Sequence, residues 1–209
     1  MNWQAMTIGA MFTLGHSTHD LPSLVRLLCQ HDVTAVADVR SVPASRFAPQ
    51  FNRNSLERGL REAGIKYVFM GNELGARTDN ASCYVDGQVQ YARLARTSEF
   101  SSGIERLVNG AQTERIAVMC SEGEPLDCHR TVLIARVLTE RGLSIDHIHA
   151  DGQLESHSSA MERLMVRFGL AEPDLFRTSS ERLEEALSRQ ERRIAYVQED
   201  FRDDRTAEG

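Results

Sequence analysis

Short apolar runs alternate with amphipathic stretches along most of the chain. Residues 33–39 are almost continuously apolar, as expected of a strand that is covered on both faces. Residues 21–31 carry apolar positions at helical spacing, and Asp20 or Thr18 before them can cap a helix. The same pattern predicts strands at residues 11–14, 33–39, 65–70, 116–119 and 143–149, and helices at residues 21–31, 54–63, 91–108 and 131–141.

Strands that alternate with helices in this way predict a mostly parallel sheet with helices on both faces, joined by right-handed crossovers. The fold class is therefore α/β, a three-layer αβα arrangement with a sheet of about five strands. Two details are added to this prediction. Residues 71–90 have no clear period and predict a functional loop, and residues 101–103 predict a break in the helix at 91–108.

The last part of the chain has a different character. Ser159 and Glu162 have capping-box spacing and predict a helix that reaches Phe168. Beyond Pro173, residues 180–201 are strongly charged, with apolar positions near heptad spacing and Gln190 as a polar interruption. These apolar residues are Leu183, Leu187, Ile194, Val197 and Phe201. They predict either a helix that packs across the body or a helix pair in a homodimer, because three heptads alone are marginal.

We therefore expect an α/β domain at residues 1–170 and a charged helical extension at residues 171–209.

Composition refines the class of protein. The 41% apolar content can supply a buried core, and the net charge of −6 argues against a uniformly basic nucleic-acid-binding surface, while a local basic cleft stays compatible with it. Lys66 is the single lysine, so cationic sites must use arginine, which suits bidentate binding of oxyanions.

The four cysteines do not indicate a disulfide framework, because a chain of 209 residues with this apolar content does not need one. A reduced, cytoplasmic protein is expected. The sequence begins without a signal-peptide pattern, and no window approaches the ~20 apolar residues that a membrane span requires. We expect no association with a membrane.

The richest chemistry follows the predicted strands. Ligands of open parallel sheets bind beyond the carboxyl ends of the strands. The residues that fall there are Gly15, His16 and Ser17 after the first strand, Asp38, Arg40, Ser41 and Arg46 after the second, Arg77 after the third, Cys120, Ser121 and Glu122 after the fourth, and His147 and His149 after the fifth. So many titratable or anion-binding residues on one edge predict a site.

Residues 119–130 are the densest part of this edge, with two thiols, three carboxylates, an imidazole and a guanidinium. A thiol near a helix start and close to Arg130 would be rich in thiolate, which suits Cys120 as a nucleophile or sulfur carrier. The alternative is that Cys120 forms a wall of the site and that Cys128 belongs to the core. A phosphatase-type loop is disfavoured, because it needs a much closer spacing than the ten positions between Cys120 and Arg130.

A metal site is also disfavoured by the sequence. Cys120, Cys128, His129 and His16 could supply four ligands, but the two cysteines lack the close spacing of zinc motifs. Adjacent Cys128 and His129 are expected to point apart on a helix. We therefore assign no metal ligand and leave the cofactor unknown, with Cys128, His129 and Asp38 in structural or supporting roles.

The arginines Arg40, Arg46 and Arg130, with Ser17 and Ser41, predict an oxyanion pocket for phosphate, sulfate or carboxylate. The alternative is internal ion pairing with Asp38, Glu122 or Asp127, and the two roles are compatible. His16 and Glu122 are the candidate acid and base groups, beside Cys120 as candidate nucleophile.

Several of these segments together resemble a known family. They are residues 13–17, 38–43, 45–46, 49–51, 74–75, 120–122, 128–130 and 147–148. In combination they are similar to the family called domain of unknown function 488, over roughly residues 7 to 168. The resemblance implies an α/β fold and a bacterial or archaeal cytoplasmic origin, and it implies no settled activity.

These observations lead to three functional hypotheses. The first is a site for an anion, either a phosphorylated small molecule or nucleotide or a nucleic-acid backbone, in an enzyme that acts on the ligand. The second is a non-catalytic nucleotide or nucleic-acid binding or regulatory module. The third is a thiol-dependent transferase or redox sensor that uses Cys120.

Overall fold

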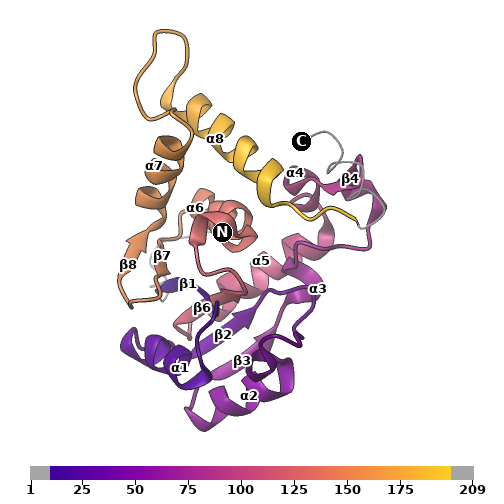
Figure 1. Cartoon of the computed structure of the whole chain (residues 1–209), viewed down its shortest axis with the longest axis vertical. Helices are drawn as coiled ribbons and strands as arrows, with labels where there is room; N and C mark the ends of the chain where they lie inside the picture. Colours follow the sequence, from indigo (N-terminus) through magenta and orange to yellow (C-terminus); the bar gives the residue numbers. More distant parts are fainter. Residues whose placement is uncertain (1–9, 199–209) are drawn as a thin grey trace.

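A six-stranded sheet forms the centre of the computed structural model, which describes residues 10–198 (Figure 1). The strand order is β3-β2-β6-β1-β7-β8, and all neighbours are parallel except β7 and β8. The strands are β1 (Met11–Gly15), β2 (Ala35–Asp38), β3 (Lys66–Phe69), β6 (Ile116–Cys120), β7 (Ile145–Ile148) and β8 (Leu154–Ser156). Gly15 pairs with Cys120 and Asp38 with Met119, so β1, β2 and β6 end at one edge.

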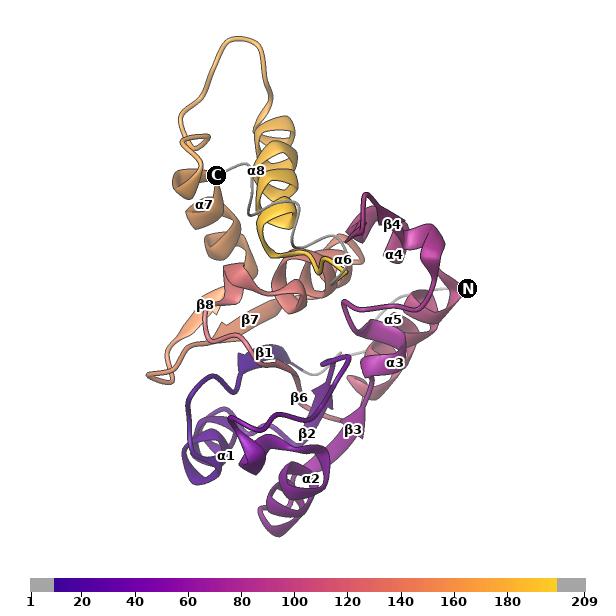
Figure 2. The ribbon, with the colours of Figure 1, turned by 45° about the vertical axis from the view of Figure 1, so that its right-hand side comes forward.

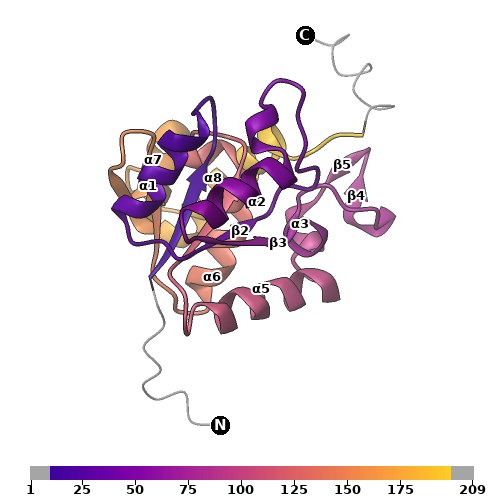
Figure 3. The same ribbon diagram turned by 90° about the horizontal axis from the view of Figure 1, so that it is seen from below.

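Helices cover both faces of this sheet, which confirms the three-layer prediction (Figure 3). The helices α1 (Leu21–Gln30) and α2 (Arg53–Glu62) pack on one face, and α5 (Ser98–Gly110) packs on the other. The π-helix η4 (Arg130–Ala135), which continues as α6 (Arg136–Glu140), lies beside α5. Successive side chains of β6 point to opposite faces of the sheet. Ala117 and Met119 pack with α1 and α2, while Cys120 packs on the face that η4 covers.

The region at residues 71–90 is more ordered than the sequence pattern predicts. It contains α3 (Gly71–Leu74), a short 3-10 turn (Ala81–Cys83) and a hairpin of β4 (Tyr84–Val85) and β5 (Gln88–Val89). The hairpin turns at Asp86 and Gly87, both with positive φ, which is the usual chemistry of a two-residue turn. The segment predicted as a loop therefore contains regular secondary structure, and its functional role stays a prediction.

Two predicted helix boundaries are also wrong. The chain breaks between α4 (Tyr91–Leu94) and α5, where Thr97 caps the new helix, and residues 101–103 lie inside α5. Gly103 is needed there because a Cβ would lie 2.7 Å from Leu74. The cap of α7 (His157–Arg167) is Ser156, whose Oγ accepts from the Ser159 backbone N–H, because β8 leads directly into the helix. The short strand β8 was not predicted.

The charged helix α8 (Ser179–Ile194) packs on α7 and on the segments around residues 125–135 (Figures 1 and 2). Leu187 and Gln190 are buried, so Gln190 belongs to the packed face and does not interrupt it. Beyond α8, the Gln198 backbone N–H donates to Gly87 O at 2.9 Å. The homodimer stays a prediction, and Phe201 lies outside the described residues.

Within residues 10–198, none of the helices combines the length and the apolar character that crossing a bilayer requires.

Candidate functional site

A cavity of about 800 Å³ opens at the carboxyl edge of the sheet. Its walls come from the ends of β2 and β6, from the segment after α3, and from the four residues that follow or end α8. Its lining residues include Arg40, Ser41, Ser45, Arg77, Cys120, Glu122, Asp127, Cys128, His129 and Ile194 to Val197. The volume falls in the range of about 300–1,000 Å³ that small-molecule sites occupy.

The loop between β6 and η4, residues 121–129, carries most of the reactive groups and is held from inside. Arg130 has no exposed surface, and it donates from Nη1 to Glu122 O at 2.6 Å and from Nη2 to Gly123 O at 3.1 Å. Gly15 lies against the same loop, where a Cβ would be 1.7 Å from Glu122 O. Glycine at position 15 therefore allows the loop to cross the end of β1.

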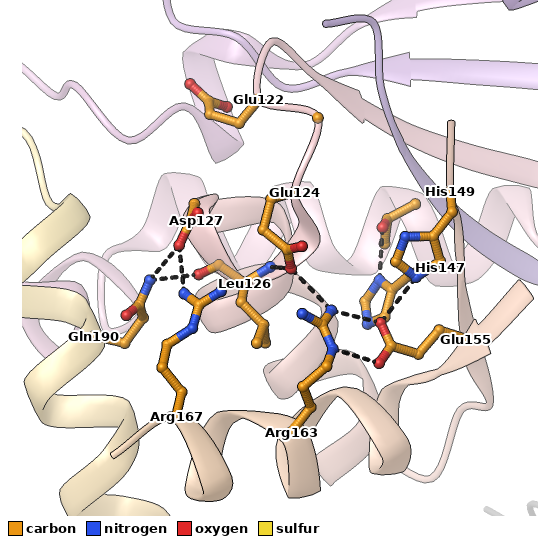
Figure 4. Close-up of polar contacts among 12 residues, drawn as sticks. Glu122, Glu124, Leu126, Asp127, His147, His149, Glu155, Arg163, Arg167 and Gln190 are labelled. Carbon is orange, nitrogen blue, oxygen red and sulfur yellow. Dashed lines mark hydrogen bonds and ion pairs between the residues drawn. The ribbon is translucent and has the colours of Figure 1, made fainter. Parts of the chain in front are cut away.

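The same loop is held from outside by α7 and α8 (Figure 4). Arg163 donates to Glu124 Oε1 at 2.8 Å, and Arg167 forms an ion pair with Asp127. Gln190 donates to Leu126 O at 2.8 Å and to Asp127 Oδ1 at 2.9 Å. These contacts make the conformation of the loop depend on the C-terminal helices.

Two sulfur atoms and one imidazole nitrogen converge in the lining of the cavity. The Nδ1 atom of His129 lies 3.8 Å from Cys120 Sγ and 3.7 Å from Cys128 Sγ. All three donor atoms lie within 4.8 Å of one another, and all three residues are buried. The prediction that Cys128 and His129 point apart is wrong, because Cys128 is extended (φ −137°, ψ 142°) and the helix begins only at Arg130.

Protonation of this cluster is strongly perturbed. The hydrogen bond with Cys128 and burial raise the pKa of the Cys120 thiol well above its ordinary value. Burial alone would raise the pKa of Cys128, but the contact with Cys120, the charge of Arg130 and the imidazole of His129 together hold it well below the ordinary value. Burial and the adjacent Cys128 raise the pKa of Glu122, whose Oε2 lies 2.9 Å from Cys128 Sγ.

His129 completes the cluster. Burial would lower the pKa of His129, but the hydrogen bond with Cys128 and the negative charge of that sulfur outweigh it and raise the pKa. The Nε2 atom is buried without a hydrogen-bond partner among the described residues, so the polar contacts of the ring lie on its Nδ1 side. The ring is therefore oriented by the two sulfur atoms.

Arg40 lies on another wall, in a buried network at the end of β2. Its Nε and Nη2 donate to Asp38 at 2.9 and 2.6 Å, and Nη2 also donates to Phe51 O. Tyr67 donates a further hydrogen bond to Asp38 at 2.8 Å. The internal ion pair that the sequence offered as an alternative is thus present for Arg40, whose Nη1 is directed toward His16.

His16 is tied into this network through both ring nitrogens. Its Nδ1 lies 3.0 Å from Ser17 O and its Nε2 lies 3.3 Å from Arg40 Nη1, which fits a neutral ring that donates at Nδ1 and accepts at Nε2. The ring also stacks on Phe51 with 4.3 Å between centroids. Burial is the main cause that lowers the pKa of His16, with the charge of Arg40 as a further cause.

The structure brings only part of the predicted site together. The cavity is lined by Cys120, Glu122, Arg40, Ser41, Cys128 and His129, whereas His16, Ser17, Arg46, Arg130 and Asp38 are not among its lining residues. The guanidinium of Arg46 lies over the ring of Phe47 at 4.7 Å. The site roles of all these residues stay predictions, including the anion-binding role of Arg46 and Arg130.

Sequence reasoning missed the C-terminal wall of the cavity. Residues 194–197 line it, and Tyr196 lies under the guanidinium of Arg77 at 4.7 Å. The apolar pattern at Ile194 and Val197 indicated burial, but it could not indicate which surface they cover. The division at residue 170 stays a prediction, and the segment beyond it contributes to the cavity.

Fold and site together define an α/β protein with a parallel sheet and a buried cysteine–histidine cluster at the carboxyl edge. The family described as Domain of unknown function DUF488 matches residues 20–137, more than half of the chain, and the chain belongs to this family. The matched range includes Arg40, Cys120 and residues 128–130, but residues 13–17 and 147–148 lie outside it. No curated protein and no solved structure matches the chain.

Proposed function

We propose that this protein binds a small anionic ligand in the 800 Å³ cavity and acts on it through the cluster of Cys120, Glu122, Cys128 and His129. The observation that carries the proposal is that the reactive cluster and two arginines line the same cavity. Arg40 and Arg77 supply guanidinium groups, and Ser41 and Ser45 supply hydroxyls. Guanidinium and hydroxyl donors are the groups that recognise phosphate and carboxylate.

Arg77 is the main candidate for contact with the anion. No carboxylate within residues 10–198 forms an ion pair with it, whereas Arg40 is already paired with Asp38. The acidic residues of the wall are also engaged, because Asp127 pairs with Arg167 and Glu122 contacts Cys128. An anion that enters the cavity therefore meets at Arg77 a guanidinium that no carboxylate of residues 10–198 neutralises.

Two alkylating reagents that differ in charge test this proposal. The protein is reduced, treated with a chelator and carries Cys29→Ser, because Cys29 is exposed and would react first. Modification of Cys120 or Cys128 is followed by mass spectrometry with iodoacetate and with iodoacetamide. We expect the ratio of the iodoacetate rate to the iodoacetamide rate to be about tenfold higher for the protein than for glutathione. This factor corresponds to about 1.4 kcal/mol of attraction for the anionic reagent.

Arg77→Gln should bring this ratio close to that of glutathione without changing the iodoacetamide rate. Arg58→Gln is the matched control, because Arg58 is exposed on α2 and far along the chain from the cavity residues. A wild-type ratio equal to that of glutathione would refute the anion site.

A thiol-dependent reaction is the second candidate, favoured by the contact of 2.9 Å between Cys128 and Glu122. The sequence favoured Cys120 as the nucleophile, but the carboxyl and imidazole contacts favour Cys128. Cys128→Ser should then abolish turnover of any substrate found in a panel of nucleotides and phosphoesters, while Cys120→Ser should retain part of it. Binding without turnover across that panel would favour the non-catalytic module.

A further inference from the structure

The donor atoms of Cys120, Cys128 and His129 lie within 4.8 Å of one another, close enough to share one metal ion. Zinc bonds of about 2.3 Å to sulfur and 2.0–2.1 Å to nitrogen, at tetrahedral angles, place a sulfur and a nitrogen ligand about 3.6 Å apart. The observed separations from His129 Nδ1 are 3.8 Å to Cys120 Sγ and 3.7 Å to Cys128 Sγ. Both nitrogen–sulfur separations are therefore close to those of a zinc site.

We propose that Cys120, Cys128 and His129 bind one Zn²⁺ through their two Sγ atoms and Nδ1, with the fourth coordination position open to the cavity. Two thiolates and an imidazole are soft and borderline donors, which select zinc over magnesium or calcium. Three protein ligands with one open position are typical of catalytic zinc sites, whereas structural sites have four protein ligands. The inference deepens the proposed function, since the ion would face the ligand that the cavity holds.

The three ligands are held in place before any metal binds. Cys120 is the last residue of β6, which is paired with β1 on one side and with β2 on the other. Cys128 and His129 lie immediately before η4, and Arg130 fixes the loop that connects them to Cys120. Little ordering is required on metal binding, so a larger share of the coordination energy appears as affinity.

Glu122 lies where it can assist the open position. It lines the cavity, and its Oε2 is 2.9 Å from Cys128 Sγ. A carboxylate next to an open zinc position accepts a hydrogen bond from the water that the metal holds, which is how such sites prepare a water nucleophile. Zn²⁺ requires two thiolates and a neutral imidazole, so its binding releases to solvent whichever protons Cys120, Cys128 and His129 carry.

The same atoms allow two other outcomes that the experiment must separate. Cys120 and Cys128 could form a disulfide, or they could remain buried thiols that bind no metal. Neither state holds a metal ion with sulfur ligands, so the spectrum of bound cobalt distinguishes both from the proposed centre.

The test uses the full-length protein, reduced and treated with a chelator, and titrates it with Co²⁺ in the absence of any anionic ligand. We expect thiolate-to-cobalt charge-transfer absorption and the intense visible bands of tetrahedral cobalt. These bands should saturate at one equivalent and disappear on addition of Zn²⁺. Absence of charge-transfer absorption in the reduced wild-type protein would refute the metal centre.

Variants identify the ligands. Cys128→Ser, Cys120→Ser and His129→Gln should each lose the charge-transfer band or weaken Co²⁺ binding at least tenfold. Cys83→Ser is the matched control, because Cys83 is buried in the same core but is not in the cluster. Wild-type cobalt spectra from all three ligand variants would overturn the assignment.

A second measurement does not depend on the folding of any variant. In the wild-type protein, Zn²⁺ should protect two of the four cysteines from Ellman's reagent, and peptide mapping should identify them as Cys120 and Cys128. Protection of neither thiol would contradict the proposal. The alkylation ratio measures the anion site in metal-free protein, so the metal centre and the proposed function can fail separately.

Discussion

Asp38 shows at the scale of one residue how the edge of the sheet is organised. It is fully buried and accepts hydrogen bonds from the backbone and side chain of Arg40 and from Tyr67. The ion pair between Asp38 and Arg40 fixes the guanidinium of Arg40 in one orientation, with Nη1 directed at His16. Because a buried guanidinium needs a counter-charge, the orientation of Arg40 depends on this single carboxylate.

Asp38→Asn should therefore destabilise the protein strongly. The variant leaves the positive charge of Arg40 buried without its partner, and loss of one member of a buried pair costs about 3–5 kcal/mol. Urea denaturation measures the change in the free energy of unfolding. Glu184→Gln, which removes an exposed ion pair with Arg136, should change it by no more than about 0.5 kcal/mol. A loss below about 1 kcal/mol for Asp38→Asn would mean that water reaches Arg40.

Two histidines, His147 on β7 and His157 on α7, form a chain of hydrogen bonds in which at least one of the two facing ring nitrogens must be unprotonated. The hydroxyl of Thr13 lies 2.7 Å from His147 Nδ1, and His147 Nε2 lies 3.2 Å from His157 Nδ1. Burial is the main cause that lowers the pKa of His147 to about 3 and that of His157 to about 4, and nearby positive charges add to it.

Acid should destabilise the fold through this pair. Between the unfolded pKa of about 6.5 and the lower folded values, the unfolded chain binds more protons, so stability falls as the pH falls from about 6.5 to about 4. His157 alone would contribute on the order of 3 kcal/mol. Unfolding measured across this range should have a smaller pH slope in His157→Gln. Met161→Ala, on the same helix, should lower stability at every pH and leave the slope intact, and equal slopes in all three proteins would contradict the assignment.

The sequence predicted which residues lie at the edge of the sheet, but it did not predict the contacts between their side chains. The sequence pattern placed Cys120, Glu122 and Arg40 at one edge because parallel strands end there together. It did not indicate that Cys128 and His129 converge, because that depends on the extended backbone of Cys128 just before the helix. Nor did it indicate that Arg130 is used inside the loop.

At the scale of elements, the site depends on a close approach between the end of β1 and the loop after β6. Gly15→Ala places a methyl group against Glu122 O, so the loop must move and carry Glu122 and Cys128 with it. We expect a loss of at least about 2 kcal/mol in urea denaturation and an altered cobalt spectrum. Gly110→Ala is the control, because its methyl group meets only the end of the Ile116 side chain. An unchanged spectrum in Gly15→Ala would show that the loop does not position the cluster.

The docking of α8 can be tested at Gln190. Its amide donates to Leu126 O and Asp127 Oδ1, so Gln190→Glu replaces a donor with a negative charge that faces two acceptors. The free energy of unfolding at neutral pH should fall by at least about 2 kcal/mol. Because residues 194–197 follow α8 into the cavity wall, alkylation of Cys120 and Cys128 should become faster. Gln153→Glu, an exposed position, should change neither quantity.

Elements with strong hydrophobic periodicity were predictable, and those defined by tertiary contacts were not. The five parallel strands follow from apolar runs, and both layers bury β1, β2 and β6 completely. The hairpin at residues 84–89 carried a recognisable Asp-Gly turn, but its strands of two residues are too short to show a period. The break before α5 depends on the cap at Thr97, and Gly103 gave a misleading signal because its role is close packing against Leu74.

At the scale of the whole molecule, the cavity lies where three parts of the chain meet. The sheet supplies Cys120 and Arg40, the loop before η4 supplies Cys128 and His129, and the segment after α8 closes the outer wall. Sequence periodicity treats these parts separately, so it predicted a C-terminal extension and could not indicate that the extension completes the cavity. The reactive cluster is therefore coupled to the stability of all three parts.

This coupling predicts that zinc stabilises the entire fold. Its ligands join the central strand β6 to the layer that begins at η4, so global unfolding must break the metal bonds. At free Zn²⁺ of 100 times Kd the gain is about 2.7 kcal/mol, which corresponds to a rise in Tm of roughly 5–10 °C for a chain of this length. Differential scanning calorimetry of the reduced, chelator-treated protein measures this shift.

The control that decides the interpretation is His129→Gln in the same experiment. Unfolded chains also bind zinc through free thiols, which opposes the stabilisation, so a rise in Tm requires a site that exists only in the folded protein. His129→Gln keeps both thiols but lacks the imidazole ligand, and its Tm should rise much less or fall. Mg²⁺ should shift neither protein, because two thiolates and an imidazole do not match its preference for oxygen ligands. An equal rise in both proteins would assign the stabilisation to zinc bound elsewhere.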